Sequence, residues 1–235
     1  MSVPRAARNA GAPVSGAPEE AAEEQVPIVT ALEADAKQGG VRVWLDGASL
    51  ATVAAEEISR LGLSVGAALA AEVVAEIERR AEVFSARCAA LRILAFRALP
   101  STEIRGRLVR KGFLKPAADE AVGALVASGL INDHEFALHY ARTRARRFRY
   151  GPGRLARDLE RMGIAGREAK EAVRSALDLE GVEAVDLLKE AAAKKLRTLR
   201  GLDAVTRRRK LKIYLLRRGF ALPDVIEVVK GAVRG

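Results

Sequence analysis

The chain of 235 residues contains one cysteine, Cys88, and only 4% aromatic residues. A single cysteine excludes a disulfide bond and a multi-cysteine metal site within one chain, and its apolar neighbours predict a small core residue. No apolar run reaches the roughly 18 residues that a membrane helix requires, because Glu72 and Glu76 interrupt the most apolar stretch. The N-terminus also lacks a signal-peptide pattern. We therefore expect a cytoplasmic protein that makes no contact with a membrane.

Catalytic motifs are lacking as well. The sequence has no Walker-type phosphate loop, and no Ser-His-Asp or Cys-His set can be assembled with any specificity. His134 and His139 lie in H-E-F-A-L-H, which is similar to a zinc-protease motif. A spacing of five, however, separates the two rings by about 140° around a helix, whereas a spacing of four would align them. We expect no metal, no cofactor and no enzymatic activity.

The net charge of +10 is unevenly distributed along the chain. Residues 1–130 carry a net charge of −1, whereas residues 131–235 carry +11. A basic C-terminal half predicts a polyanionic partner or an acidic protein surface. The alternative is that these arginines simply cover solvated helix faces.

The N-terminal quarter divides into two parts. Residues 1–26 are rich in Ala, Pro, Gly and Glu without periodicity, which predicts a disordered tail. Alternating apolar residues then surround Gly39-Gly40 and Asp46-Gly47, so we expect two or three short strands that form a small β-hairpin region. Helical spacing follows, with Ser64 as a candidate cap, and completes a segment over residues 27–81.

An internal repeat follows Pro100. The segments R-L-V-R-K-G-F, D-L-E-R-M-G-I and Y-L-L-R-R-G-F place Gly112, Gly163 and Gly219 at equivalent positions. Each segment predicts a helix that ends at a glycine in the left-handed region, followed by an apolar residue that packs back onto the last turn. Units of about 50 residues predict a mainly α protein, an elongated curved solenoid of stacked three-helix repeats. The expected repeats are residues 82–130, 131–180 and 181–235.

The middle repeat carries the most local signals. Asn132 and Glu135 have the spacing of a capping box at the start of a helix. Phe136 and Tyr140 share one face of that helix, and Arg144 lies on the same face. Arg144 is therefore either a partner contact or a partly buried arginine whose head pairs with a carboxylate. The sequence Gly151-Pro152-Gly153 then ends this helix and opens the next.

Two groups of basic residues are candidates for contact with a partner protein or with DNA phosphate. The first group occupies two adjoining helices of the middle repeat: Arg142, Arg146, Arg147, Arg149, Arg154, Arg157 and Arg161. The second group lies in the last repeat: Lys194, Lys195, Arg207, Arg208, Arg209 and Lys210. Phe148 and Tyr150 lie among the arginines, where they either stack on bases or fill the interface between repeats.

Three motifs in this order resemble the RecX family of recombination regulators. They are I-N-D-H-E-F-A-x-x-Y-A-x-x-R, G-P-x-R-L-x-x-D-L-x-x-M-G-I, and the flanking L-V-R-K-G-F and L-L-R-R-G-F. The resemblance covers roughly residues 27–235. The structural signature that it implies consists of Asn132, Asp133, Phe136, Tyr140, Arg144, Gly151, Pro152, Gly112, Gly163 and Gly219.

The resemblance also implies a fold and a function. Family members consist of three tandem three-helix repeats, and they modulate the RecA recombinase, usually by inhibiting it on its single-stranded-DNA filament. We accordingly expect a monomeric regulator of RecA in recombination, repair and the SOS response; the alternative is a general basic nucleic-acid-binding protein. The chain departs from the family at Asn132, where an acidic residue is usual, and at Pro100, where a serine cap is usual. The second departure predicts that the helix starts at Ser101.

Overall fold

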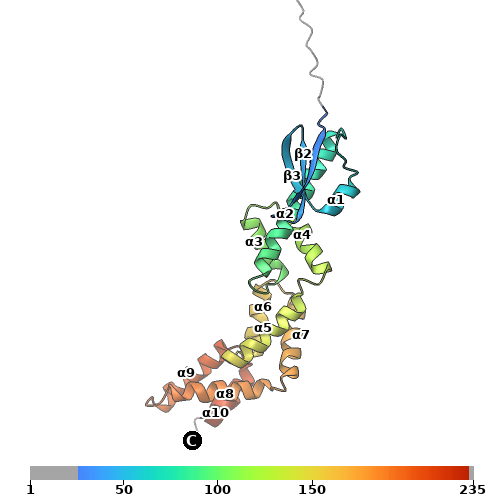
Figure 1. Cartoon of the computed structure of the whole chain (residues 1–235). Coiled ribbons are helices and arrows are strands. Elements are labelled where there is room, and N and C mark those ends of the chain that lie inside the picture. The colour runs from blue at the N-terminus through green and yellow to red at the C-terminus, as the bar shows by residue number, and fades with distance from the viewer. Residues whose placement is uncertain (1–25, 233–235) are drawn as a thin grey trace, which may run out of the picture.

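The computed structural model describes residues 26–232, which form three strands and ten helices in an elongated molecule (Figure 1). The predicted disordered tail lies almost entirely outside the described residues. The strands are β1 (Val29–Asp35), β2 (Gly40–Leu45) and β3 (Ala48–Val53). The helices are α1 (Ala55–Arg60), α2 (Ala71–Leu94), α3 (Ser101–Arg110), α4 (Lys115–Ala127), α5 (Asp133–Phe148), α6 (Pro152–Arg161), α7 (Gly166–Leu179), α8 (Ala184–Arg197), α9 (Ala204–Arg217) and α10 (Leu222–Ala232).

The strands form an antiparallel sheet in the order β1-β2-β3, which confirms the predicted hairpin region. Gly39 and Gly47, at the two turns, have φ angles of 75° and 79°, a conformation in which glycine meets no steric penalty. The core of this region comprises Val29, Val43 and Val53, all fully buried. Strand alternation thus directs one face of the sheet into a core that α2 completes.

The prediction that Ser64 caps the next helix is wrong, because α2 begins at Ala71. The intervening loop lies along the edge of β1 instead: the Val29 N–H donates to the Ala67 carbonyl, and the Gly66 N–H donates to the Val29 carbonyl, at 2.9 and 2.8 Å. A strand edge needs partners for its backbone groups, and this requirement outweighs a local capping signal.

Helix α2 serves two parts of the molecule. Ile77 and Ala81 belong to the core beneath the sheet, whereas Ala86 and Ala90 belong to the core formed with α3 and α4. The expected boundary between residues 81 and 82 therefore falls inside one continuous helix. We propose that the first repeat takes the C-terminal half of α2 as its first helix, with the later boundaries at residues 130 and 180 unchanged.

The helix ends that define the repeat have one geometry. Gly112, Gly163 and Gly219 have φ angles of 98°, 89° and 85°, as predicted. The N–H of the residue after each glycine donates to the carbonyl five residues earlier, which is the Schellman motif. These bonds join Phe113 to Leu108, Ile164 to Leu159 and Phe220 to Leu215, at 3.2, 3.1 and 3.4 Å.

The second helices of the three repeats, α3, α6 and α9, meet end to end. The Gly151 N–H donates to the Arg218 carbonyl at 2.7 Å, and the Gly153 N–H donates to the Gly219 carbonyl at 3.0 Å. The N-terminus of α6 therefore contacts the C-terminal end of α9. In the same way, the Thr102 hydroxyl at the start of α3 donates to the Met162 carbonyl at the end of α6. Opposite helix-dipole ends therefore face each other at both junctions.

The two junctions between repeats differ in their cores. Helices α5 to α10 share one continuous hydrophobic cluster, so the second and third repeats bury their faces against each other as expected. The first repeat has its own cluster, in which Ile104 and Leu108 are fully buried. Hydrogen bonds of α3 with α5 and with the end of α6 join that repeat to the second.

Candidate interaction site

The start of α5 is fixed by two side chains. The Glu135 N–H donates to the Asn132 side chain at 3.0 Å, which confirms the predicted cap. The carboxylate of Asp133 accepts from both the N–H and the hydroxyl of Ser101, each at 2.7 Å. Helix α3 does start at Ser101, and Asp133 supplies from another repeat the cap that Pro100 does not provide. The return bond from Glu135 to the Asn132 N–H is not found within residues 26–232.

Three arginines of the first basic group form ion pairs with carboxylates at the end of α7 and on α8. Arg142 and Arg146 both pair with Glu180, at 2.6 and 3.4 Å, and Arg149 pairs with Glu190 at 2.8 Å. Glu180 directly follows α7 and Glu190 lies on α8. The three arginines therefore extend toward α7 and α8. Arg146 is 72% exposed, and ion pairs in water contribute little, so its charge remains accessible to a partner.

Aromatic rings and cations alternate along the opposite part of α5. The Arg144 guanidinium lies 5.2 Å from the centre of the Tyr140 ring and 5.1 Å from that of Phe148. Arg147 lies over Phe148 at 5.4 Å, and Phe136 stacks on Tyr140 at 6.2 Å. Arg144 is half-buried, but its head rests on aromatic rings, so the expected carboxylate pairing is corrected to a cation–π contact.

The series continues across the junction between the second and third repeats. Phe148 stacks on Tyr150 at 5.6 Å, and Tyr150 lies between Arg154 at 3.9 Å and Arg218 at 5.2 Å. Arg218 also lies over Tyr214, at 4.8 Å. Both Phe148 and Tyr150 are half-buried in these contacts, so of the two roles left open by the sequence the structure favours filling the interface.

Four arginines from two repeats surround one hollow, which we call the arginine pocket. Arg154, Arg157 and Arg161 come from α6, and Arg217 comes from the end of α9, around a volume of about 510 Å³. Asp158 and Glu160, also on α6, complete the lining, so the pocket has a net charge of +2. Sequence analysis predicted the first three as contacts but missed Arg217. Its place two residues before Gly219, equivalent to that of Arg161 before Gly163, is the signal that could have identified it.

A buried carboxylate organises this pocket. Asp158 is 7% exposed, pairs with Arg154 at 3.6 Å and with Arg161, and accepts a hydrogen bond from the Tyr140 hydroxyl at 3.4 Å. Burial, reinforced by the charge of Asp158, raises the pKa of Tyr140 above its usual value, so the hydroxyl stays a donor. By contrast, Arg157 is exposed and has no ion pair within the described residues. An incoming anion would therefore meet a guanidinium that forms no ion pair of its own in that part of the chain, although the Glu160 carboxylate lines the same hollow.

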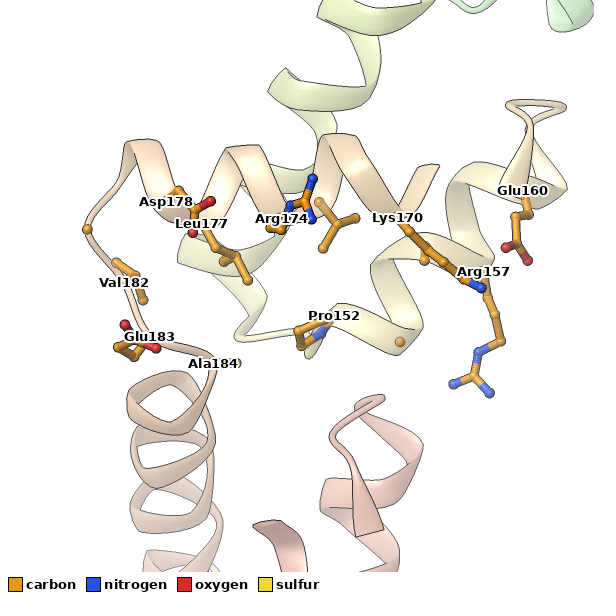
Figure 2. Close-up of a pocket in the computed structure, with 14 residues that line it drawn as sticks. Pro152, Arg157, Glu160, Lys170, Arg174, Leu177, Asp178, Val182, Glu183 and Ala184 are labelled. Carbon is orange, nitrogen blue, oxygen red and sulfur yellow. The ribbon is translucent and has the colours of Figure 1, made fainter. Parts of the chain in front are cut away.

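Arg157 also borders a second cavity, of about 660 Å³, between α6, α7 and the loop that leads to α8. Figure 2 shows Arg157 and Glu160 on α6 and Lys170 and Arg174 on α7 around this cavity, whose floor includes Leu177. Its three basic and three acidic side chains balance, whereas the arginine pocket has four arginines and two carboxylates, so this cavity favours no single class of ligand.

The second basic group lies on the third repeat. Lys195 lies over the Tyr214 ring at 5.3 Å, whereas Lys194, Arg208, Arg209 and Lys210 are exposed. Four of the six residues, Arg207 to Lys210, lie in the first two turns of α9, close to the positive end of its dipole. Four consecutive basic residues near the start of a helix concentrate positive charge there and favour a bound polyanion.

The two histidines, His134 and His139, are both exposed on α5. Within residues 26–232 no group of three or more His, Cys, Asp or Glu side chains is placed to hold a metal ion. In the same part of the chain, no helix is both long enough and apolar enough to cross a membrane.

Comparison with known proteins identifies two of the repeats. Residues 132–173 match a profile described as the second three-helix domain of RecX, and residues 182–229 match the third. "Regulatory protein RecX" of Chlorobium limicola is 32% identical over 140 residues, which cover 60% of this chain and 84% of that protein. The protein of the same name from Streptomyces lividans is 32% identical over 66% of this chain and 80% of its own.

Solved structures show the same fold. A crystal structure of "regulatory protein RecX" superposes with a TM-score of 0.73 at 24% identity and covers 87% of this chain and 99% of that one. RecX from Lactobacillus salivarius superposes with a TM-score of 0.56 at 22% identity, over 64% and 96% of the two chains. The repeat helices, their glycine ends and these matches agree, and the chain belongs to the RecX family.

Proposed function

We propose that this protein is a cytoplasmic, monomeric regulator of RecA that binds the RecA filament on single-stranded DNA and inhibits it without chemistry of its own. Membership of the RecX family supports a regulatory role. The observation that carries the proposal is the arginine pocket, in which four arginines from two repeats and two carboxylates line one hollow of net positive charge. Guanidinium groups bind phosphate and carboxylate through paired, charge-assisted hydrogen bonds.

The proposed mechanism is mechanical obstruction. The second and third repeats share one core, so the arginine pocket and the second basic group are held at a fixed separation. An elongated body with two fixed cationic sites can contact filament subunits or DNA phosphates at several points. The filament must then displace the regulator before it extends or opens, which lowers recombinase, ATPase and co-protease activity.

Charge reversal in the arginine pocket tests the proposal. Unmodified protein at substoichiometric amounts should slow DNA-dependent ATP hydrolysis by RecA. The double variant Arg157→Glu, Arg217→Glu should need at least about a hundredfold more protein for the same effect, because it removes two charge-assisted contacts worth about 1.5–3 kcal/mol each. The matched control is Arg60→Glu, a remote and 58% exposed arginine, which should inhibit like the unmodified protein. Unchanged ATPase activity and filament length at excess protein would refute the proposed function.

The basic start of α9 supports a second candidate, general nucleic-acid binding. Pure phosphate binding weakens steeply as salt rises and does not require RecA. Capture of RecA by the immobilised protein should therefore survive nuclease treatment under the first proposal and disappear under the second.

A further inference from the structure

The arginine pocket lies where the second and third repeats meet, and contacts between the two repeats fix its shape. Its lining comes from α6 and from the end of α9. The Arg154 guanidinium donates to the Arg217 carbonyl at 3.5 Å, so a lining residue of one repeat is bonded to the backbone of the other. The N–H groups of Gly151 and Gly153 also bond to carbonyls at the end of α9. The hollow is therefore present before any ligand arrives.

Two of the four arginines are held in place within the protein. Arg154 lies 3.9 Å from the centre of the Tyr150 ring and pairs with Asp158 at 3.6 Å. Arg161 pairs with the same carboxylate, and its Nε donates to the Arg157 carbonyl at 3.4 Å. These bonds use two of the three nitrogens of each guanidinium within residues 26–232. Because a guanidinium has five N–H donors, each arginine keeps donors for an anion.

The other two arginines determine the net charge of the pocket. Arg157 and Arg217 are exposed, and neither forms an ion pair in the described part of the chain. The Asp158 and Glu160 carboxylates lower the charge of the four arginines to +2. A ligand with two negative charges balances this charge, whereas a ligand with one negative charge leaves a cation uncompensated.

We infer that the arginine pocket binds a phosphate monoester. This group carries close to two negative charges near neutral pH and has three terminal oxygens that accept hydrogen bonds. A carboxylate, or a phosphodiester inside a nucleic-acid strand, has one charge and two such oxygens, so it matches the charge and the donors of the pocket less well. The inference rests on the proposed function for its biological setting and names the ligand class of the same site. The terminal phosphate of a DNA strand and a free nucleotide both contain a monoester.

The test compares two small ligands that differ by one methyl group. Isothermal titration calorimetry with the full-length chain, at constant ionic strength and about pH 8, measures the binding of methyl phosphate and of dimethyl phosphate. Methyl phosphate is a dianion under these conditions, because its second proton leaves at about pH 6, whereas dimethyl phosphate carries one charge. Methyl phosphate should bind at least about tenfold more tightly, since one further charge-assisted hydrogen bond contributes about that factor or more.

Variants of the pocket locate the binding site. Arg157→Gln and Arg217→Gln should each weaken the binding of methyl phosphate by about tenfold or more. Both positions are exposed, so the fold should survive, and circular dichroism verifies this. The matched control is Arg167→Gln, which removes an exposed arginine of α7 outside the pocket and should bind like the unmodified chain.

Two further titrations identify the source of the monoester. Oligothymidylate with a 5′-phosphate is compared with the same strand ending in a 5′-hydroxyl, and adenosine monophosphate is titrated separately. Tighter binding of the phosphorylated strand, lost in Arg157→Gln, identifies a strand end as the ligand. Tight binding of the nucleotide without a preference between the strands identifies a free nucleotide. Either result supports the inference.

The inference and the proposed function fail separately. Dimethyl phosphate or acetate that binds as tightly as methyl phosphate overturns the inference, and so do pocket variants that bind methyl phosphate within about twofold of the unmodified chain. The proposed function then stands, because arginines also bind the carboxylates of a protein. Conversely, RecA ATPase activity that does not respond to excess protein refutes the proposed function, while selective binding of methyl phosphate still supports the ligand class.

Discussion

Replacement of Gly219 by alanine tests whether α9 docks end to end against α6. Gly219 has a φ of +85°, and a Cβ atom there would lie 2.2 Å from the Arg154 backbone nitrogen and 2.5 Å from the Arg154 Cβ. The left-handed conformation costs a non-glycine residue about 1–2 kcal/mol, and overpacking adds about 1–3 kcal/mol. Because the obstructing atoms belong to the first turn of another helix, they move only if α6 moves. We expect a total loss of about 2–5 kcal/mol of unfolding free energy.

The matched control is Gly181→Ala, at the end of α7 in the same hydrophobic cluster. Gly181 has a φ of +59°, and nothing lies within 4 Å of its Cβ position. The following residue, Val182, donates to the Leu177 carbonyl at 3.1 Å, so the helix-end motif is the same as that at Gly219. This variant should lose only the conformational cost of about 1–2 kcal/mol.

Urea unfolding followed by far-ultraviolet circular dichroism measures both losses. The difference between the variants, about 1–3 kcal/mol, isolates the end-to-end contact of α6 and α9. Equal losses, within about 0.5 kcal/mol, would show that α9 does not rely on this close approach and would refute the stacked arrangement.

Three further predictions follow from individual contacts. Asp133→Ala removes the cap that α5 provides to α3 and should cost about 1–2 kcal/mol by thermal unfolding, whereas an unchanged midpoint would contradict the cap. Hydrogen bonds, first from Arg42, lower the pKa of Asp35 from 3.8 to about 2; its stabilisation is therefore present above the ordinary pKa and is lost as the pH falls toward 2, and acid unfolding followed by Trp44 fluorescence should lose that dependence in Asp35→Asn. Burial raises the pKa of Tyr140 above 10.0, so alkaline absorbance titration should show one tyrosine ionising late and that step missing in Tyr140→Phe; an unchanged curve would contradict its burial.

Much of the fold could be predicted from the sequence because its signals are local. A helix end at glycine needs a left-handed residue and an apolar residue after it, and three copies of this pattern identified Gly112, Gly163 and Gly219. The cap at Asn132 needs a side-chain oxygen three residues before an N–H, and this spacing can be read directly from the sequence. Ser64 shows the limit of such signals, because the adjacent strand edge determined its surroundings.

The candidate site was less predictable, because arginines that look alike in the sequence have different neighbours in the folded structure. The sequence does not distinguish Arg142 from Arg157. Arg142 pairs with Glu180, which is 38 residues away in the sequence and is brought near only by folding. Likewise, the interaction of Tyr150 with Arg218 depends on the junction of two repeats. Arg217 is the exception, because its equivalence with Arg161 in the repeat makes its position deducible.

Carboxylates therefore decide which of the many arginines form an ion pair within the protein and which do not. Glu180 and Glu190 engage the arginines that face α7 and α8, and Asp158 holds Arg154 and Arg161 beside the arginine pocket. Arg157 and Arg217 form no ion pair within residues 26–232, and the pocket that they share with two other arginines keeps a net charge of +2 after its two carboxylates, Asp158 and Glu160, are counted. Like charges at close range repel one another, and an anion that enters the pocket relieves this repulsion as well as forming its own bonds. The gain from anion binding should therefore be larger there than at an equally exposed arginine that already has a carboxylate.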